Sequence, residues 1–410
     1  MRVMVALDNR FSKTKNGSIY SLNVCDYTFW QRYLKVFDEV VVFARVVEVD
    51  ETELQKQPAN GAGVRFKPLP YFIGPWQYLR NLPALNRLAR DSLGEAEAFI
   101  LRIPGTVASL VWRYLRKNNV PYGIEVTGDP WEALSIENVS SLAGPVARFL
   151  MTRNTKIQCR GAAAAGYVTE KLLQLKYPCR CWSTHFSSIE LPDSTIVGEE
   201  RIAQRLALFD DAINQKRPFR ICHVGSMDAL YKAQDILMDA VAICSRKGLN
   251  IELTFVGGGR HSPYFVNKAQ KIGIRERVKF LGELPPGEPV IEQLDKADLF
   301  VLPSTTEGLP RALIEAMARA LPCLGSDVGG IQELLQPDDR FPAGDANLLA
   351  ARIESVLGDQ NRLARMAQWN VEKAKAYCKQ ELDRRRTALY RKLAELTQRE
   401  KTRCTRNYQQ

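Results

Sequence analysis

The chain has 410 residues, 45% of them hydrophobic, with a net charge of +11 and nine cysteines. This length is too great for one ordinary domain and fits two, and the apolar fraction is that of a globular protein with sizeable cores. No run of 18 apolar residues occurs, so we expect no transmembrane helix, and the short apolar stretch at the start predicts a first strand and no secretory signal. We therefore expect a cytoplasmic protein whose scattered cysteines are reduced and mostly buried.

Strand-like apolar runs alternate with amphipathic segments of helical length along the whole chain. The predicted strands are Val3–Leu7, Val40–Ala44, Ala98–Ile103, Tyr122–Val126, Ile221–Val224, Ile251–Val256, Val278–Leu281, Leu299–Leu302 and Pro322–Gly325. Such alternation is typical of an α/β fold with two parallel sheets, each covered by helices on both faces. Ligands of such sheets bind at the carboxyl ends of the strands.

The division between the two predicted domains lies between about Ser183 and Pro218, where a turn-like stretch and a polar helix precede the next clear strand. We therefore place the first domain at 1–190 and the second at 200–370. The remaining predicted elements are two helices, at 361–376 and 379–399.

The C-terminal segment is strongly basic, because residues 371–410 carry 12 Lys or Arg and only five Asp or Glu. A solvated helix is the commonest explanation of such a segment, and a surface that meets anionic lipid is a second. No basic motif interleaved with aromatic residues occurs, so we expect no nucleic-acid partner.

The most informative motif joins two carboxylates eight residues apart, Glu307 and Glu315, just after the predicted strand Leu299–Leu302. The spacing places Glu307 on a loop that opens a helix and Glu315 inside that helix. Carboxylates accept hydrogen bonds from sugar hydroxyls. Glu307 alone could be an acid that offsets a helix dipole, whereas Glu315 lies in an almost wholly apolar segment and must find partners there.

The start of the same helix is a candidate anion site. Pro310 suits the first helical turn, because no amide donor is lost there. The amides of Gly308 and Leu309 are therefore predicted to be free to receive phosphate or sugar oxygens.

Three further strand ends are predicted to complete this site. Glycine lets the backbone approach a ligand closely, although each of these loops alone could be an ordinary turn. Lys232 lies near the start of the helix predicted after the strand Ile221–Val224. A cation at a helix start is unfavourable with the helix dipole. This position therefore favours a role in ligand binding over that of an ordinary solvated lysine. The candidate ligand-binding residues of the strand ends are Gly225, Ser226, Gly257, Gly258 and Leu281.

Over about 219–335 these segments resemble the E-x7-E pattern of retaining GT-B glycosyltransferases, especially the large family 4. The resemblance implies two Rossmann-like domains facing a central cleft, with a C-terminal helix of about 377–400 packing back on the first. It also implies that Lys232 contacts the donor diphosphate, that Glu307 binds the transferred sugar, and that Glu315 accepts from the ribose hydroxyls.

The chain departs from the family pattern at several points. Ser226 stands where an arginine is usual, and Ala233 where a glycine is usual. Many members carry a catalytic histidine in the first domain, and none stands in the comparable place here, so Asp129 or Glu125 is the candidate acceptor-site carboxylate. An Asp in a turn before proline is the alternative. Gly17 resembles the glycine of the loop that faces the donor diphosphate.

The resemblance predicts a retaining hexosyltransferase that moves a sugar from a nucleotide-sugar donor, UDP-linked in the first instance, to a saccharide or polyprenyl-linked saccharide acceptor in surface polysaccharide biosynthesis. It implies no metal and no cofactor, because Lys232 and the helix amides stabilise the departing diphosphate. Two alternatives remain open: a nucleotide-sugar epimerase of the same fold, and a non-catalytic nucleotide-sugar-binding protein.

A peripheral contact with anionic membrane, at the inner face of the plasma membrane, is a further expectation. Two cationic and aromatic segments, 75–80 and 112–117, could touch a membrane surface or a polyprenyl acceptor. Ordinary amphipathic helices, whose long cations reach solvent, are the commoner explanation of such segments.

Overall fold

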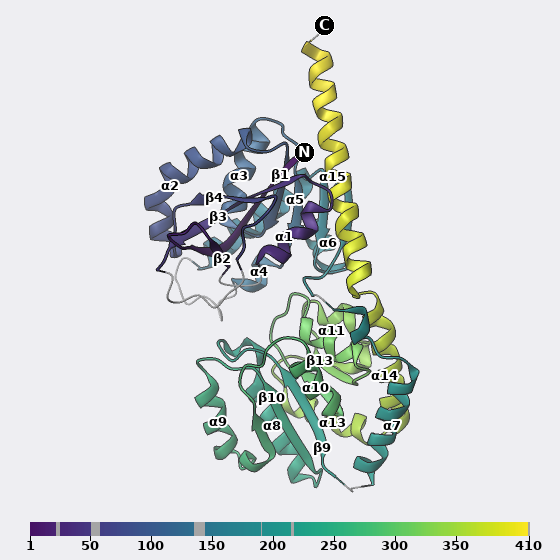
Figure 1. Ribbon diagram of the computed structural model, residues 1–410. Coiled ribbons are helices and arrows are strands. Elements are labelled where there is room, and N and C mark those ends of the chain that lie inside the picture. The colour runs from purple at the N-terminus through teal and green to yellow at the C-terminus, as the bar shows by residue number, and fades with distance from the viewer. Residues whose placement is uncertain (22–24, 51–57, 135–143, 190, 215–216, 409–410) are drawn as a thin grey trace. The chain divides into compact units, whose positions relative to one another are not determined.

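The computed structural model describes residues 1–21, 25–50, 58–134, 144–189, 191–214 and 217–408, without the side chains of 403–408. The chain divides into two compact units, Met1–Phe186 with Asp383–Gln410 and Ser187–Leu382. Each unit is a largely parallel sheet covered by helices (Figure 1), and the α/β class predicted from the sequence is therefore confirmed.

The first unit is built on a sheet of eight strands. Seven of them run parallel in the order β4-β3-β1-β5-β6-β7-β8, and the short β2 pairs antiparallel with the end of β1. The central β1 is buried from Val3 to Ala6, as expected of a strand covered on both faces. The strands are β1 (Arg2–Lys13), β2 (Ile19–Ser21), β3 (Glu39–Glu48), β4 (Val64–Leu69), β5 (Ala98–Ile103), β6 (Gly123–Val126), β7 (Ala164–Tyr167) and β8 (Trp182–His185).

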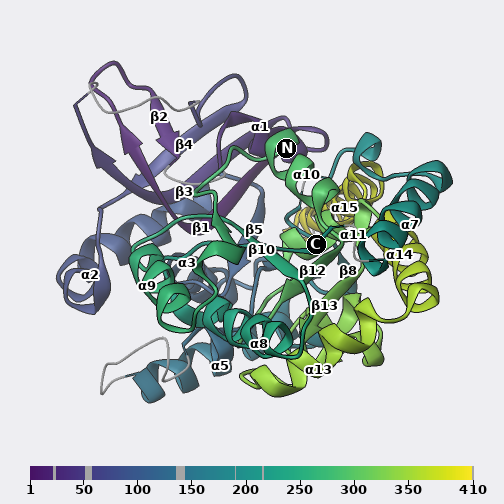
Figure 2. The ribbon, with the colours of Figure 1, turned by 90° about the horizontal axis from the view of Figure 1, so that it is seen from below.

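Helices cover the two faces of this sheet according to the direction in which they cross it. The connection through α1 leads from β1 to β3, and those through α3 and α5 lead the opposite way along the sheet. Because parallel crossovers are right-handed, α1 lies on one face and α2, α3 and α5 lie on the other (Figure 2). The helices are α1 (Tyr27–Leu34), α2 (Gly74–Asp91), α3 (Thr106–Lys117), α4 (Pro130–Ala133), α5 (Gly144–Gly161), α6 (Leu172–Lys176) and α15 (Lys379–Tyr408).

The C-terminal helix α15 packs on the first unit beside α1. The rings of Tyr390 and Tyr33 stack with their centroids 4.7 Å apart, and both hydroxyls donate to Oε1 of Glu125, at 2.8 and 2.9 Å. Arg102 donates to the other carboxylate oxygen at 2.7 Å. Burial, together with the Glu125 charge, raises the pKa of both tyrosines. The basic C-terminal segment therefore contains a helix with one buried face, which a fully solvated helix would lack.

The second unit has a six-stranded parallel sheet in the order β11-β10-β9-β12-β13-β14. This is the strand order of a Rossmann sheet, in which the chain reverses its direction of travel between the first and fourth strands, here β9 and β12. The strands are β9 (Phe219–Val224), β10 (Ile251–Val256), β11 (Val278–Phe280), β12 (Leu299–Leu302), β13 (Cys323–Ser326) and β14 (Arg340–Phe341). The helices are α7 (Glu199–Ile213), α8 (Gln234–Arg246), α9 (Ser262–Lys271), α10 (Glu288–Lys296), α11 (Arg311–Ala318), α12 (Ile331–Leu334), α13 (Ala346–Leu357) and α14 (Gln360–Lys375).

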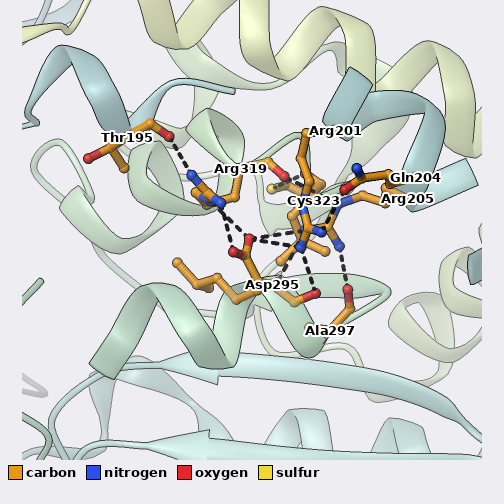
Figure 3. Close-up of polar contacts among 10 residues, drawn as sticks. Thr195, Arg201, Gln204, Arg205, Asp295, Ala297, Arg319 and Cys323 are labelled. Atoms are coloured by element: carbon orange, nitrogen blue, oxygen red, sulfur yellow. Dashed lines mark hydrogen bonds and ion pairs between the residues drawn. The ribbon is translucent and has the colours of Figure 1, made fainter. Parts of the chain in front are cut away.

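The helix α7, which precedes the second sheet, is held against α10 and the end of α11 by arginine contacts (Figure 3). Arg205 is 1% exposed and donates to the backbone carbonyls of Leu294, Ala297 and Arg319. The carboxylate of Asp295 accepts two hydrogen bonds from the Arg319 guanidinium, at 2.9 and 2.7 Å. Burial lowers the pKa of Arg205 to about 10, so this guanidinium remains charged at neutral pH. The polar helix is therefore part of the second unit and no mere linker.

All nine predicted strands occur, and the structure adds five more. β4, β7, β8, the hairpin strand β2 and the two-residue β14 were not predicted. β7 has the sequence Ala-Ala-Gly-Tyr, which lacks β-branched residues, and β14 is too short for any alternation. His185 ends β8 in the first sheet. Within the described residues, no helix combines the length and the hydropathy that a membrane crossing requires.

Candidate functional site

The predicted site residues of the second unit gather where its sheet reverses direction. The chain leaves β9 and β12 toward opposite edges of the sheet. In sheets of this topology, ligands bind at the carboxyl ends of these two strands. Gly225 and Ser226 follow β9, and the loop that leads to Glu307 follows β12. Motifs that lie about 80 residues apart in the sequence therefore meet at one place.

An ion pair joins the two loops. The Nζ of Lys232 lies 2.5 Å from Oε1 of Glu307, and their side chains are 15% and 8% exposed. Ser304 is buried and donates to the same carboxylate oxygen at 2.7 Å. The amide of Thr305 donates to the carbonyl of Tyr231 at 2.7 Å, so the backbones on either side of the pair are also joined. Both side chains are consequently held in place before any ligand arrives.

Lys232 lies in a 3-10 turn, Leu230–Lys232, directly before α8. The next residue, Ala233, has a left-handed backbone with a φ of 50° and is buried. Only glycine adopts this conformation without strain, which explains why a glycine is usual at this position in the resembled family. Ala233 therefore adopts this backbone conformation at a local energetic cost.

Two glycines bring the loop after β13 against the loop that carries Glu307. The amide of Gly330 donates to the carbonyl of Gly308 at 2.7 Å. A Cβ on Gly329 would lie 1.8 Å from the carbonyl oxygen of Glu307, and one on Gly330 would lie 2.1 Å from that of Gly308. Any side chain at either position would push the Glu307 loop out of place.

The glycine-rich loops after β9 and β10 are also in direct contact. Gly257 has a φ of 126°, and a Cβ there would lie 2.2 Å from the carbonyl oxygen of Gly225. The amide of Met227 donates to the carbonyl of Gly258 at 2.7 Å. The exposed Ser226 turns its hydroxyl toward Asp228, with Oγ 3.1 Å from Oδ2. Leu281, after β11, is 39% exposed at the same edge of the sheet.

A buried histidine lies beneath these loops. His223 in β9 is wholly buried, and its Nδ1 lies 2.9 Å from the carbonyl oxygen of Val301. Burial lowers its pKa to about 4, with the Lys232 charge as a smaller cause, so the ring is neutral at physiological pH. Its Nε2 has no hydrogen-bond partner within the described part of the chain, and a Cβ on Gly225 would lie only 2.9 Å from it.

The start of α11 differs from the prediction in one respect. Pro310 has an extended backbone and precedes the helix as its cap, so it does not lie in the first helical turn. The amides of Gly308 and Leu309 donate to no acceptor in the described ranges, and the chemistry expected of this helix start is unaffected. An anion placed there would meet free donors and the positive end of a helix.

Glu315 lies in the second turn of α11 and is partly buried. Burial raises its pKa, and the charge of Arg311, one turn earlier, offsets this in part. No described side chain or amide donates a hydrogen bond to its carboxylate, in contrast to Glu307. A partly buried acceptor without a donor is suited to a ligand that brings hydroxyl groups.

The candidates of the first unit have structural partners instead. Asp129 caps α4 by accepting a hydrogen bond from the amide of Trp131 at 2.8 Å. Its carboxylate also accepts hydrogen bonds from Nζ of Lys176 and from the Tyr177 hydroxyl. These contacts give Asp129 a structural role as a capping residue, and its proposed catalytic role stays a prediction. Glu125 is likewise occupied, within the cluster that anchors α15.

Gly17 lies in the turn of a hairpin between β1 and β2. It has a φ of 88°, and its amide donates to the carbonyl of Thr14 at 3.0 Å. The turn explains the glycine, and its predicted contact with a donor diphosphate stays a prediction.

Three residues of the second-unit site were missed from the sequence. Ser304 carries no signal beyond its place three residues before Glu307, and His223 resembles an ordinary strand residue. Arg260 follows the triple glycine, and its Nε donates to the carbonyl of Asp228 at 2.6 Å. Arg260 is exposed and is linked through Asp228 to Ser226, where the family pattern would place an arginine. No group of three or more His, Cys, Asp or Glu suited to a metal ion occurs in the described ranges.

Residues 206–372, which carry this site, match the family model of glycosyl transferases group 1. The chain is 27% identical over 363 residues, 88% of each chain, to protein CapJ of Staphylococcus aureus. It is 35% identical over 150 residues to the amylovoran biosynthesis glycosyltransferase AmsK of Erwinia amylovora, covering 34% of this chain and 36% of that one.

Solved structures share the fold over almost the whole chain. Sucrose-phosphate synthase from Thermosynechococcus elongatus superposes with a TM-score of 0.67 at 16% identity, covering 96% of this chain and 99% of that one. HepE from Anabaena, solved in complex with UDP, superposes with a TM-score of 0.63 at 16% identity, covering 94% and 98%. At this level of identity the likeness establishes the GT-B fold and no more.

Proposed function

We propose that this chain transfers a hexosyl group from a nucleotide-sugar donor to a saccharide or lipid-linked saccharide acceptor, because residues 206–372 match the family model of glycosyl transferases group 1. The observation that carries the proposal is the Lys232–Glu307 pair at the switch point of the second sheet, beside two free amides. UDP is the proposed nucleotide, supported by the HepE structures, which hold UDP or UDP-glucose.

The proposed reaction retains the anomeric configuration. The bond between the anomeric carbon and the donor diphosphate breaks, and the diphosphate keeps the electron pair. The acceptor hydroxyl forms the new bond on the same face, and its proton passes to the departing diphosphate oxygen. This route needs no protein base, which accords with the occupied carboxylates of Asp129 and Glu125. A surface polysaccharide is the proposed product class, supported by the name of AmsK.

In this proposal Lys232 pairs with Glu307 when no donor is bound and with the donor diphosphate when one is. Without a donor it neutralises Glu307, whose carboxylate would otherwise be a costly charge in a half-buried place. With a donor bound, Lys232 and the amides of Gly308 and Leu309 face the charge that develops on the diphosphate. Glu307 can then accept from the sugar hydroxyls while Ser304 keeps it in position. Positive charge comes from the protein, and we propose that no metal is required.

Calorimetric titration with UDP, GDP and ADP tests the donor site. We expect the wild type to bind one of the three selectively and Glu315→Ala to lose about tenfold or more in affinity, because a ribose hydrogen-bond acceptor is removed. Glu292→Ala, a change at an exposed acid on α10, is the control and should bind as the wild type does. Binding of none of the three nucleotides would contradict the proposed donor site.

Product analysis separates the proposed transferase from its alternatives. Incubation with the donor alone should give slow hydrolysis to free sugar and nucleoside diphosphate, unaffected by a chelator. Conversion of the donor into an epimeric nucleotide sugar would identify an epimerase. Binding without any turnover would identify a non-catalytic nucleotide-sugar-binding protein.

A further inference from the structure

The outer surface of α2, α3 and α5 in the first unit has an extreme charge balance. These three helices carry ten Lys or Arg and one acid, Asp91, whereas the whole chain has 57 Lys or Arg and 46 Asp or Glu. All of the cations are exposed except the half-buried Arg148. The helix that follows the first strand of the second unit, α8, has two acids and one cation. The cations of α2, α3 and α5 are Arg80, Arg87, Arg90, Arg113, Arg116, Lys117, Arg148, Arg153, Lys156 and Arg160.

The three helices form one continuous layer on one side of the sheet. Buried residues from all three helices belong to a single hydrophobic cluster. The amide of Gln158 in α5 donates to Ser109 in α3 at 2.9 Å. The three helices lie on the same side of the sheet (Figure 2), and their exposed sides together are here called the three-helix face.

Large apolar side chains are exposed at the beginning of two of these helices. In α2 and the residue before it, Ile73, Trp76 and Leu79 are exposed, and the Trp76 side chain is the most open at 83%. In α5, Val146, Phe149 and Leu150 are exposed, with Phe149 at 60%. Single exposed apolar residues are common on soluble proteins, but a repeated group of this kind marks an interaction surface.

The apolar and cationic residues follow the same stripe along each helix. In α2 the exposed positions Ile73 and Trp76 are continued at helical spacing by Arg80, Arg87 and Arg90. In α5 the exposed positions 146, 149 and 150 are continued by the cations at 153, 156 and 160. Helices that follow parallel strands begin at the carboxyl edge of the sheet, so both apolar groups lie toward that edge.

One of these cations is positioned by an aromatic neighbour. The Arg148 guanidinium lies 3.8 Å from the centroid of the Trp131 ring, and its Nε donates to the Trp131 carbonyl at 2.6 Å. The Trp131 ring is 42% exposed. A tryptophan with an adjacent cation is the combination that occurs at the boundary between lipid headgroups and acyl chains.

We propose that the three-helix face docks on an anionic lipid bilayer, with Ile73, Trp76, Phe149 and Leu150 entering the acyl boundary while the arginines contact the headgroups. Amphipathic helices that lie in a membrane interface combine these two features. Aliphatic side chains offer nothing to a nucleic acid, which would gain from stacked rings and phosphate contacts alone. All residues of the face belong to the first unit, so the inference does not rest on the donor site of the second.

Vesicle flotation of the full chain tests this docking. We expect binding to vesicles of equal parts phosphatidylglycerol and phosphatidylcholine at low salt, weak binding to pure phosphatidylcholine, and loss at high salt. Vesicles with brominated acyl chains should quench tryptophan fluorescence, and much of this quenching should disappear in Trp76→Phe. A structural surface tryptophan would show no such quenching.

Paired substitutions separate the two components of the contact. Arg113→Gln with Arg153→Gln should weaken vesicle binding by roughly 20-fold, at roughly fivefold for each cation near an anionic surface. Trp76→Ser with Phe149→Ser should weaken it by at least about 100-fold, because two buried apolar side chains are lost. The matched controls in the second unit are Arg246→Gln with Lys271→Gln, and Trp369→Ser, all at exposed positions.

Three results would overturn the proposal. The first is equal binding, or no binding, to anionic and neutral vesicles. The second is a loss of binding in the control variants as large as that in the variants of the three-helix face. The third is salt-dependent retention of a single-stranded RNA without vesicle binding, which would make the face a nucleic-acid surface.

Discussion

The two units place acidic side chains at the same edge of similar sheets but use them differently. In the first unit, Asp8 accepts from the Thr106 hydroxyl at 2.7 Å and from the amide of Val107 at 3.2 Å, and so caps α3. Glu125 and Asp129 are likewise surrounded by donors of their own unit. In the second unit, Glu307 is held by one lysine and one serine, and Glu315 has no donor among the described residues.

This difference indicates which carboxylates are available to a ligand. An acceptor that is saturated by internal donors stabilises the fold, and a ligand would have to displace those donors at a cost of several kcal/mol. An acceptor beside a lysine and free amides can exchange partners when a ligand enters. Substitutions should therefore reduce stability in the first unit and reduce binding or turnover in the second.

The largest expected effect is that of Lys232→Ala. Removal of the cation that faces the departing diphosphate should lower kcat/KM for sugar transfer by about 100- to 1000-fold. The thermal midpoint should fall as well, because the Glu307 carboxylate loses its counter-charge and keeps only the Ser304 donor. Steady-state kinetics and thermal unfolding measure the two quantities on the same preparation.

Lys247→Ala is the matched control for Lys232→Ala. Lys247 lies in the same unit, where it pairs with Glu354 at 2.8 Å on an exposed surface. Its loss should leave turnover unchanged and cost less than about 1 kcal/mol of stability. A loss of turnover below tenfold in Lys232→Ala would show that this lysine does not face the diphosphate.

The second-unit fold was largely predictable, because its strands are continuous apolar runs. Leu299–Leu302 and Ile251–Val256 have the predicted bounds, and the glycine motifs follow the strands directly. In the first unit, β7 and β8 are short and lack such runs, and β4 contains two cations and a proline. Strands of this kind form because neighbouring strands and helices bury them, and a local pattern does not contain that information.

The part of the site that depends on residue type and on position along the chain was predictable. Glu307, Glu315 and Lys232 could be chosen from residue type and from their places near helix starts. The donation from Ser304 and the burial of His223 depend on contacts between strands that only the folded sheet brings together. The partners of Asp129 in the folded unit, Lys176 and Tyr177, lie almost 50 residues later in the chain, so the local pattern did not indicate them.

Glu125→Gln should give the largest stability change in the first unit. The substitution leaves the half-buried Arg102 without its counter-charge and disturbs two buried tyrosine hydroxyls. We expect a loss of about 3 to 5 kcal/mol in the free energy of unfolding, measured by urea denaturation. Nucleotide affinity of the folded protein should not change.

Tyr390→Phe provides the graded counterpart of Glu125→Gln. It removes one of the hydroxyl donors to Glu125 and keeps the ring that stacks on Tyr33. We therefore expect the free energy of unfolding to fall by about 1 kcal/mol. If both variants were as stable as the wild type, the cluster would not be what anchors α15. A loss of sugar transfer at unchanged stability would instead return Glu125 to the candidate acceptor site.

His223→Gln should change how stability depends on pH. The pKa of His223 is lowered from 6.5 to about 4 in the folded state, so the unfolded chain binds the proton more tightly. Its contribution to stability is therefore complete above pH 6.5 and is lost as the pH falls toward 4. Between pH 6.5 and 4, the free energy of unfolding of the wild type should fall by up to about 3 kcal/mol more than that of the variant, as measured by urea denaturation at each pH. Parallel loss in both proteins would contradict the buried, neutral imidazole.

The smallest expected effect concerns Glu315, and it has opposite signs for stability and for binding. Burial raises its pKa, so the folded state binds the proton more tightly than the unfolded chain, and the charged form is a cost to folding at neutral pH. Glu315→Gln should therefore stabilise the second unit by up to about 1 kcal/mol while weakening nucleotide binding. Wild-type nucleotide affinity should fall on acidification, beginning above the ordinary glutamate pKa of 4.5, and that of the variant should not. Because a purely structural glutamate would change stability alone, a variant that is more stable and binds nucleotide normally would remove Glu315 from the donor site.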